Sequence, residues 1–426
     1  MIGAVFSMGL LCTLLVLRVP MMIAICTAVI LNFYFSGAWA ITLPQTMISG
    51  MSRFVLIALP LFVLAGGLMN SGGISARLFE FARSIVGQFR GGLAHVNVLT
   101  SMFFGGMIGS STADLAGTGS IVIPAMKANK YPADFSAAVT ASSAGIGPLI
   151  PPSSPMILYS AVTGVSLGAL FLAGVIPGIL LGLSQMLIVA YLARRRGWKP
   201  YSAFSFKEVL RAGWRAFFSF GMPSIIVGGL VIGVFTPTEA GAFAVVYALV
   251  LSMLIYRMLT FRELYRVIVN AVQLTGELLI IVSLSFALGA GLTNAHVPEA
   301  LVVIIDVFAI GDSEYLRILG MVILAIVAGM VLDPLIPVLL PIILPTLIAF
   351  DIDLIHFGVL TVIAVVIGQV TPPMAIALFI SGRIAQVDQI DVLKANMPFF
   401  YGIIIFLLIA IAVPEVATWL PELVRD

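Results

Sequence analysis

The sequence predicts an all-α polytopic membrane protein with two inverted-topology repeats, each holding about five spans, one re-entrant hairpin and one proline-broken helix. Of the 426 residues, 61% are hydrophobic and only 9% are charged, whereas soluble domains carry about 25% charged residues. Apolar stretches near the roughly 20 residues that a membrane-crossing helix needs recur along the chain. Glycine and proline motifs of the first half return at a fixed spacing in the second half. These observations exclude a soluble globular enzyme.

In the first repeat, residues 1–193, four apolar stretches are expected to cross the membrane. They are residues 2–17, 21–38, 54–70 and 168–192. Residues 41–52 are short and contain a proline, so we expect a helix at the membrane interface. Residues 74–90 carry apolar side chains at helical spacing between three arginines, a pattern typical of an amphipathic helix that lies in the interface.

The stretch from Gly105 to Pro124, GGMIGSSTADLAGTGSIVIP, is the most unusual part of the first repeat. It places small polar side chains between glycines inside a very apolar sequence. Because hydrocarbon offers no water to hydroxyl or backbone groups, this stretch must be buried in protein or line a wet cavity. The apolar arms within residues 95–126 are each too short to cross. We therefore predict a re-entrant hairpin with the polar stretch at its tip.

Residues 133–165 are apolar but contain GPLIPPSSP from Gly147 to Pro155. Four prolines cannot lie in one continuous helix, so two half-helices joined by an unwound bend are expected. After a basic linker at 194–216 the scheme recurs in the second repeat, residues 217–426. Its expected elements are spans at 217–235, 239–256, 273–293 and 398–413, interfacial pieces at 261–272 and 297–309, a hairpin at 315–350 broken at Asp333-Pro334, and a proline-broken span at 355–382.

Fixed offsets between the halves indicate an internal repeat. Adding 221 carries Gly147, Pro151, Pro152, Ser160 and Pro177 to Gly368, Pro372, Pro373, Ser381 and Pro398, and adding 224 carries Phe62, Gly67, Leu68 and Asn70 to Phe286, Gly291, Leu292 and Asn294. An odd number of crossings in each half makes their topologies opposite. With the basic linker inside, both termini lie outside, and 18 of the 21 Lys and Arg residues fall on the inner side.

Inverted repeats bring two hairpin tips and two proline bends together near the membrane midplane. Hydroxyls and unwound carbonyls can coordinate a hard cation such as Na⁺, and helix N-termini favour a carboxylate. We expect one half-site at Ser110, Ser111, Thr112 and the bend Gly145 to Ser153, and the other at Asp333, Pro334, Gly368, Gln369 and Thr371. Asp114 either caps the following helix or contacts solute, and Asp333 is either a cation ligand or an N-cap.

Four motifs resemble one known family over essentially the whole chain. They are GGMIGSSTADLAGTGSIVIPAM, IGPLIPPSSPMILYS, VFTPTEAGAFAVVYALV and VTPPMAIALFI. The chain is similar to the large membrane subunit of tripartite ATP-independent periplasmic (TRAP) transporters, in the ion-transporter superfamily. The resemblance implies Na⁺-coupled import of a carboxylate-bearing solute by an elevator-type movement. C4-dicarboxylates, sialic acids and other organic acids all remain open as solutes.

The resemblance also implies partners and site residues. The partners are a periplasmic substrate-binding protein and a separate small four-helix membrane subunit in the bacterial inner membrane, with both termini of this chain in the periplasm. Na⁺ is the coupling ion and no cofactor is expected. The implied Na⁺ ligands are Ser110, Thr112, Gly145, Gly147, Asp333, Gly368, Gln369 and Thr371. The implied solute contacts are Ser110, Ser111, Thr112, Pro152, Ser153, Thr371 and Pro372.

Two alternatives stay open from the residues. One is a stand-alone anion or carboxylate transporter of the same superfamily that needs no binding protein. The other is a membrane-embedded enzyme, although the sequence shows no metal-binding motif of His, Glu or Asp and no Ser/Lys dyad. A channel is disfavoured because two mirrored half-sites suit alternating access better than a continuous pore.

Overall fold

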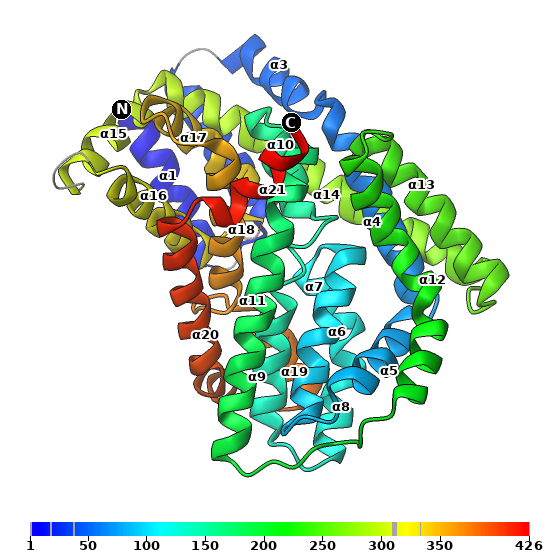
Figure 1. Cartoon of the computed structure of the whole chain (residues 1–426). Coiled ribbons are helices and arrows are strands. Elements are labelled where there is room, and N and C mark those ends of the chain that lie inside the picture. Colours follow the sequence, from blue (N-terminus) through cyan, green and yellow to red (C-terminus); the bar gives the residue numbers. More distant parts are fainter. Residues whose placement is uncertain (1, 18, 37–38, 309–312, 333, 426) are drawn as a thin grey trace.

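The computed structural model describes residues 2–17, 19–36, 39–308, 313–332 and 334–425 (Figure 1). Within these ranges every regular element is a helix, and the single isolated backbone bridge joins Arg90 to Pro200. The expected all-α fold is therefore confirmed. In the same ranges six helical segments are long and apolar enough to cross a membrane. They are η1 with α4 (Phe54–Ile57, Ala58–Ser71), α11 (Leu167–Arg195), α12 (Phe206–Val231), α13 with the π-helix η2 (Pro237–Leu249, Val250–Ile255), α14 (Phe261–Asn294) and α20 (Gln389–Ala412).

The remaining helices are shorter, and several of them flank the breaks expected from the sequence. They are α1 (Ile2–Val16), α2 (Met21–Ser36), α3 (Trp39–Met51), α5 (Ile74–Val86), α6 (Gly92–Ile108), α7 (Ser111–Gly117), α8 (Gly119–Ala128), α9 (Ala133–Ala144), α10 (Ser154–Thr163), α15 (Val297–Phe308), α16 (Glu314–Gly329), α17 (Leu335–Ala349), α18 (Leu354–Gln369), α19 (Ile376–Ala385) and α21 (Glu415–Arg425). Both hairpins and both proline-rich stretches are thus interrupted helices, as predicted.

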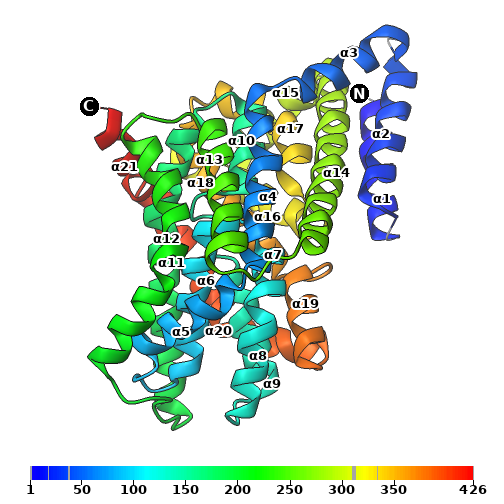
Figure 2. The same ribbon diagram turned by 90° about the vertical axis from the view of Figure 1, so that its right-hand side faces the viewer.

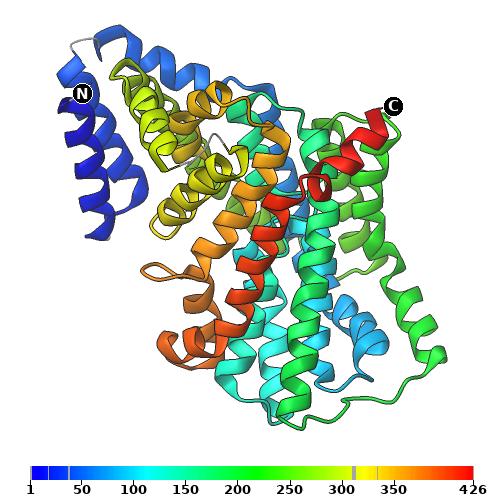
Figure 3. The same cartoon turned by 60° about the vertical axis from the view of Figure 1, so that its left-hand side comes forward.

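Two parts of the prediction are wrong in extent, and one helix is missing from it. The interfacial piece at 261–272 and the span at 273–293 form one 34-residue helix, α14, because a Thr260–Glu263 capping box starts it and no proline interrupts it. The basic linker 194–216 is helical beyond residue 205, where the Ser205 hydroxyl accepts the N–H of Glu208. The C-terminal helix α21 was not expected, and it packs against α11 (Figure 3).

The helical pair α1–α2 stands on one side of the molecule against α14, with α3 across one end (Figure 2). Its apolar side chains share a cluster with α14 and α17, including Leu11, Ala28, Leu288 and Val338. A larger cluster joins α9 and α10, on either side of the first proline-rich bend, to α16 and α17, on either side of the second hairpin break. Its largest fully buried members include Phe62, Phe104, Phe135, Tyr159, Phe357 and Phe399. The interrupted helices therefore contribute to the larger of these two buried apolar clusters.

Glycines allow α11 to approach the first proline bend closely. A Cβ at Gly174 of α11 would lie 2.2 Å from the carbonyl oxygen of Leu149. That atom belongs to backbone rather than to a side chain that can turn away. Close approach at Gly174 thus holds the bend against a long helix.

We expect Gly174→Ala to lower the melting temperature of the purified protein, because the added methyl group overpacks this contact at a cost of about 1–3 kcal/mol. Gly228→Ala in α12 is the matched control, since a Cβ there meets no atom within 4 Å. The comparison is a thermal unfolding measurement in one detergent. Equal melting temperatures for the two variants would contradict the close contact.

Candidate functional site

The polar stretch predicted as a hairpin tip lies at the break between α6 and α7. Gly109 takes a left-handed conformation with φ of +61°, and a Cβ on it would lie 1.6 Å from the carbonyl oxygen of Pro152. No other residue fits there without displacing backbone. The N–H of Ser154 donates to the Gly109 carbonyl oxygen at 3.3 Å. The tip therefore lies in direct contact with the proline-rich bend.

Residues 145–153 form the unwound bend between α9 and α10. The Ser153 hydroxyl donates to the carbonyl oxygen of Pro148 and accepts the N–H of Met156, so Ser153 closes the bend and caps α10. Among the described residues nothing donates a hydrogen bond to the carbonyl oxygens of Gly145 and Gly147. The bend thus holds two uncommitted oxygen ligands close to the tip.

The second half contains an equivalent pair of contacts. Gly368, at the end of α18, packs on Gly329 at the end of α16, where a Cβ on Gly368 would lie 2.4 Å from the Gly329 carbonyl oxygen. In the first half, a Cβ on Gly105 would lie 2.8 Å from the Cα of Gly147. Gly105 and Gly329 are 224 positions apart, and Gly147 and Gly368 are 221 apart. Packing of each bend on the neighbouring hairpin supports the predicted internal repeat.

A cavity of about 500 Å³ opens where the two half-sites meet. Ser110, Ser111 and Thr112 line it from the first tip, and Gln369 and Pro334 line it from the second half. The hydroxyls of Ser110 and Thr112 lie 3.1 Å apart. The Ser111 Oγ and Gln369 Oε1 atoms are buried and, among the described residues, have no hydrogen-bond partner. Asp333 lies outside the described residues, next to the cavity-lining Pro334.

Three helices begin at this cavity. Ser110 is the N-cap of α7, Ser153 is the N-cap of α10 and Pro334 is the N-cap of α17. The first residues of all three helices line the cavity. Because helix N-termini carry partial positive charge and unpaired N–H groups, the starts of α7 and α17 favour an anion. At α10 the first N–H groups are already used, since Ser154 donates to Gly109, Pro155 has no N–H and Met156 donates to Ser153. The longest of the three, α17, has 15 residues.

The other predicted site residues do not line the cavity. They are Gly145, Gly147, Pro152, Ser153, Gly368, Thr371 and Pro372. Thr371 turns its hydroxyl to the carbonyl oxygen of Ile367 at 2.6 Å. Asp114 is also buried, and its Oδ1 atom accepts a hydrogen bond from Thr118 at 2.6 Å rather than facing the cavity.

The structure adds three polar residues that the sequence interpretation did not include in the site. Asn70 at the end of α4, Ser154 at the start of α10 and Glu277 within α14 all line the cavity. Glu277 could have been found as an acid inside an apolar helix, a feature that usually marks function. Asn70 and Glu277 come from α4 and α14, helices outside the two predicted hairpins.

The chain thus has the features of a multi-pass membrane transporter: several apolar helices long enough to span, and a cavity lined by broken helices. Residues 8–416 match the model of the family described as "Tripartite ATP-independent periplasmic transporter, DctM component". The chain belongs to this family, as the sequence resemblance indicated. Its relatives are named as transporter permeases, and the chain is a transporter subunit rather than an enzyme.

Relatives with different named solutes match most of the chain. The sialic acid TRAP transporter large permease protein SiaM of Vibrio cholerae is 36% identical over 89% of both chains. The C4-dicarboxylate large permease DctM of the same species is 33% identical, covering 96% of this chain and 95% of the relative. The 2,3-diketo-L-gulonate large permease YiaN of Escherichia coli is 32% identical over 87% of both chains.

Two solved transporters share the fold at low sequence identity. The YdaH transporter of Alcanivorax borkumensis gives a TM-score of 0.62 at 13% identity, with 89% of both chains covered. MtrF of Neisseria gonorrhoeae gives 0.64 at 14% identity, with 89% of this chain and 85% of that chain covered. These similarities concern the fold alone.

Gly109→Ala tests the contact between tip and bend. We expect it to abolish or strongly reduce solute uptake, because the methyl group would displace the Pro152 carbonyl and the left-handed backbone would be strained. Gly164→Ala is the control, since Gly164 also has positive φ, of +78°, but a Cβ there meets no atom within 4 Å. Uptake is compared at equal amounts of membrane-inserted protein. Equal uptake by the two variants would contradict a role for the contact between tip and bend.

Proposed function

We propose that this chain carries a carboxylate-bearing solute across the bacterial inner membrane, together with Na⁺. The observation that carries the proposal is the single cavity lined by both half-sites, with hydroxyls at one tip and helix N-termini on the same wall. An anion in this cavity is stabilised by the N-terminal ends of α7 and α17 and by the hydroxyls of Ser110 to Thr112.

The solute is an organic acid. The three relatives are named for sialic acid, C4-dicarboxylates and 2,3-diketo-L-gulonate, which share a carboxylate group. The helix N-termini are suited to that group, since they favour negative charge whatever the rest of the molecule is. The more variable part of the solute would then face the wall with Asn70 and Glu277.

Na⁺ is the proposed co-transported ion, because both half-sites are rich in oxygen atoms. Hard cations prefer oxygen ligands. In the first half-site these are the free carbonyl oxygens of Gly145 and Gly147 and the hydroxyls of Ser110 and Thr112. In the second, the unpartnered Gln369 Oε1 atom supports a site with Asp333, Gly368 and Thr371. A membrane carboxylate such as Asp333 is costly unless it is paired with a cation.

The proposal includes the assembly and the movement expected from the family. A periplasmic binding protein delivers the solute, and a small four-helix membrane subunit completes the transporter. The basic linker lies in the cytoplasm and both termini in the periplasm, which follows the distribution of Lys and Arg. Residues 1–193 and 217–426 form the two inverted repeats, and the interrupted helices move together as an elevator.

Uptake in reconstituted vesicles tests the proposal. With the chain, its small subunit and the cognate binding protein present, we expect solute accumulation to require an inward Na⁺ gradient. The solute class is first identified by a thermal-shift screen of the binding protein. Equal uptake of free solute by this chain alone would instead support a stand-alone transporter, and accumulation without Na⁺ would remove the coupling.

In the same vesicles, we expect Asp333→Ala to abolish Na⁺-driven accumulation while the protein remains inserted. Ser110→Ala with Thr112→Val should weaken apparent solute affinity on the order of tenfold or more, because two hydroxyls that contact a charged group are lost. Ser120→Ala is the matched control, since its hydroxyl bonds the carbonyl of Gly117 on the same hairpin and does not line the cavity. Unchanged uptake by Asp333→Ala would remove that residue from the coupling site.

A further inference from the structure

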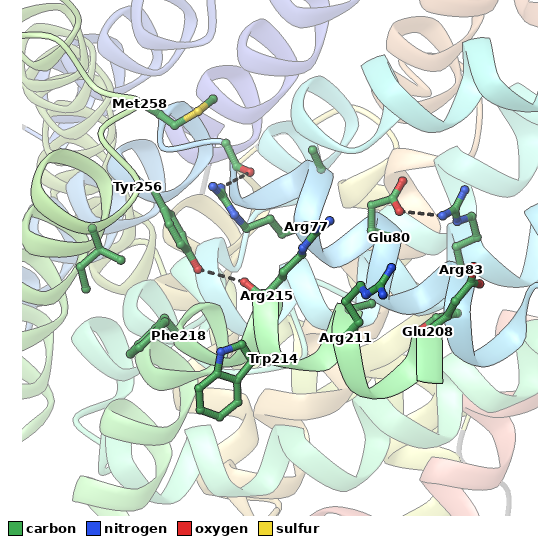
Figure 4. A pocket seen from close by; sticks show the side chains of 15 residues that line it. Arg77, Glu80, Arg83, Glu208, Arg211, Trp214, Arg215, Phe218, Tyr256 and Met258 are labelled. Carbon is green, nitrogen blue, oxygen red and sulfur yellow. Dashed lines mark hydrogen bonds and ion pairs between the residues drawn. The ribbon is translucent and has the colours of Figure 1, made fainter. Parts of the chain in front are cut away.

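A second cavity, of about 700 Å³, lies away from the hairpin tips (Figure 4). Its walls are the amphipathic helix α5, the first turns of α12, and the end of η2 with the following turn. We call it the arginine pocket, because Arg77, Arg83, Arg211 and Arg215 line it, against two acids, Glu80 and Glu208. The transport function proposed above gives this pocket no role.

Two of the four arginines in the arginine pocket are uncommitted. Arg83 pairs with Glu80 at 2.7 Å. The side chains of Arg211 and Arg215 have no ion pair or hydrogen bond within the described part of the chain. Figure 4 shows them reaching from α12 towards the space that Arg77 borders from α5. An anion there would meet guanidinium groups from two helices.

Arg77 is held in place on the α5 side. Its guanidinium carbon lies 3.5 Å from the centre of the Tyr256 ring, and its Nη1 atom donates to the carbonyl oxygen of Gly73 at 3.0 Å. The Tyr256 hydroxyl in turn donates to the carbonyl oxygen of Arg215 at 3.3 Å. These contacts join α5, η2 and α12, so one wall of the pocket is pre-ordered before any ligand binds.

The surroundings of the arginine pocket are apolar and exposed. Trp214 is 74% exposed, Met258 is 53% exposed and Ile255 is 47% exposed, and all three line the pocket. Phe217 and Leu254, on the neighbouring turns of α12 and η2, are also exposed. Both helical segments belong to candidate membrane spans. Large exposed apolar side chains beside arginines at a span end are typical of the lipid headgroup region.

We propose that the arginine pocket binds the phosphate group of an anionic phospholipid, with its acyl chains along Trp214, Ile255 and Met258. Guanidinium groups suit this ligand because their planar fork can bind two phosphate oxygens at once. Basic pockets between membrane helices on the cytoplasmic side recognise such headgroups. The lipid would bridge α5 to α12. The chain runs from α5 through a short turn into α6, which leads to the first hairpin tip, so the lipid would contact the helix before α6.

Lipid binding is measured on the full-length chain in detergent, by native mass spectrometry and by thermal shift. The added ligands are phosphatidylglycerol, zwitterionic phosphatidylcholine and inorganic phosphate. The test variant is Arg211→Gln with Arg215→Gln. The matched control is Lys207→Gln with Arg262→Gln, which removes the same charge from exposed positions near the starts of α12 and α14 outside the pocket.

We expect phosphatidylglycerol to bind and stabilise the wild-type chain and the control, and to bind the test variant roughly tenfold or more weakly, since two basic contacts are lost. Phosphatidylcholine and inorganic phosphate should give little stabilisation. Ala76→Phe should also weaken phosphatidylglycerol binding, because it fills the pocket from α5 without a change of charge. This variant keeps the test decisive if the double arginine variant does not fold.

Other results would overturn the proposal. Equal weakening in the test and control variants would show a general charge effect and no specific pocket. Unchanged phosphatidylglycerol binding in Ala76→Phe or in the folded arginine variant would place the lipid elsewhere. Competition by inorganic phosphate at the concentration that phosphatidylglycerol needs would identify a soluble phosphate as the ligand instead of a lipid.

Discussion

The structure depends on one constraint: a polar backbone inside an apolar protein must find partners without water. The first hairpin tip meets this constraint by packing on the first proline bend. Gly109 comes so close to the Pro152 carbonyl that no side chain fits, and its own carbonyl oxygen accepts the N–H of Ser154. In this way the first hairpin tip and the first proline bend give each other a hydrogen bond and close packing. Neither break could exist alone in a hydrocarbon environment.

The same constraint explains why the site lies at the breaks. A helix interior has no free N–H or carbonyl group, whereas helix ends leave several unsatisfied. The starts of α7, α10 and α17 meet at one cavity, and the carbonyl oxygens of Gly145 and Gly147 lie in the bend that packs on the first tip. A single region therefore offers N–H groups to an anion and oxygen atoms to a cation. The two hairpins are chemically unequal, since hydroxyls mark the first tip and a carboxylate and a proline mark the second.

One continuous stretch of chain links the arginine pocket to the cavity at the hairpin tips. The arginine pocket lies on α5, which continues through a short turn into α6 and so to Gly109 and Ser110. On its other side the pocket lies on α12, a long exposed helix that packs against α5 and α13. A ligand between α5 and α12 would therefore bridge α12 to the segment of chain that leads into the first interrupted helix. The proposed lipid would thus lie close to the point where the chain enters the first interrupted helix.

Sequence alone determined the class of protein and the positions where its helices break. Composition showed a multi-pass helical protein, and prolines, glycines and hydroxyls in apolar stretches showed both broken helices, because those residues have strong local effects that need no knowledge of packing. Element ends were less accurate: α14 was divided in two and the start of α12 was missed, since polarity at a span end does not stop a capped helix.

Only the tertiary structure decided which side chains share a surface. It placed Ser110, Ser111, Thr112 and Gln369 on the cavity wall and added Asn70 and Glu277 from distant helices. Four other predicted residues do not line the cavity: Gly145, Gly147, Pro152 and Ser153. The arginine pocket also depends on contacts between α5, α12 and η2, which lie far apart in sequence. Local patterns report backbone preferences, whereas a shared cavity is set by long-range packing, which spacing along one chain does not specify.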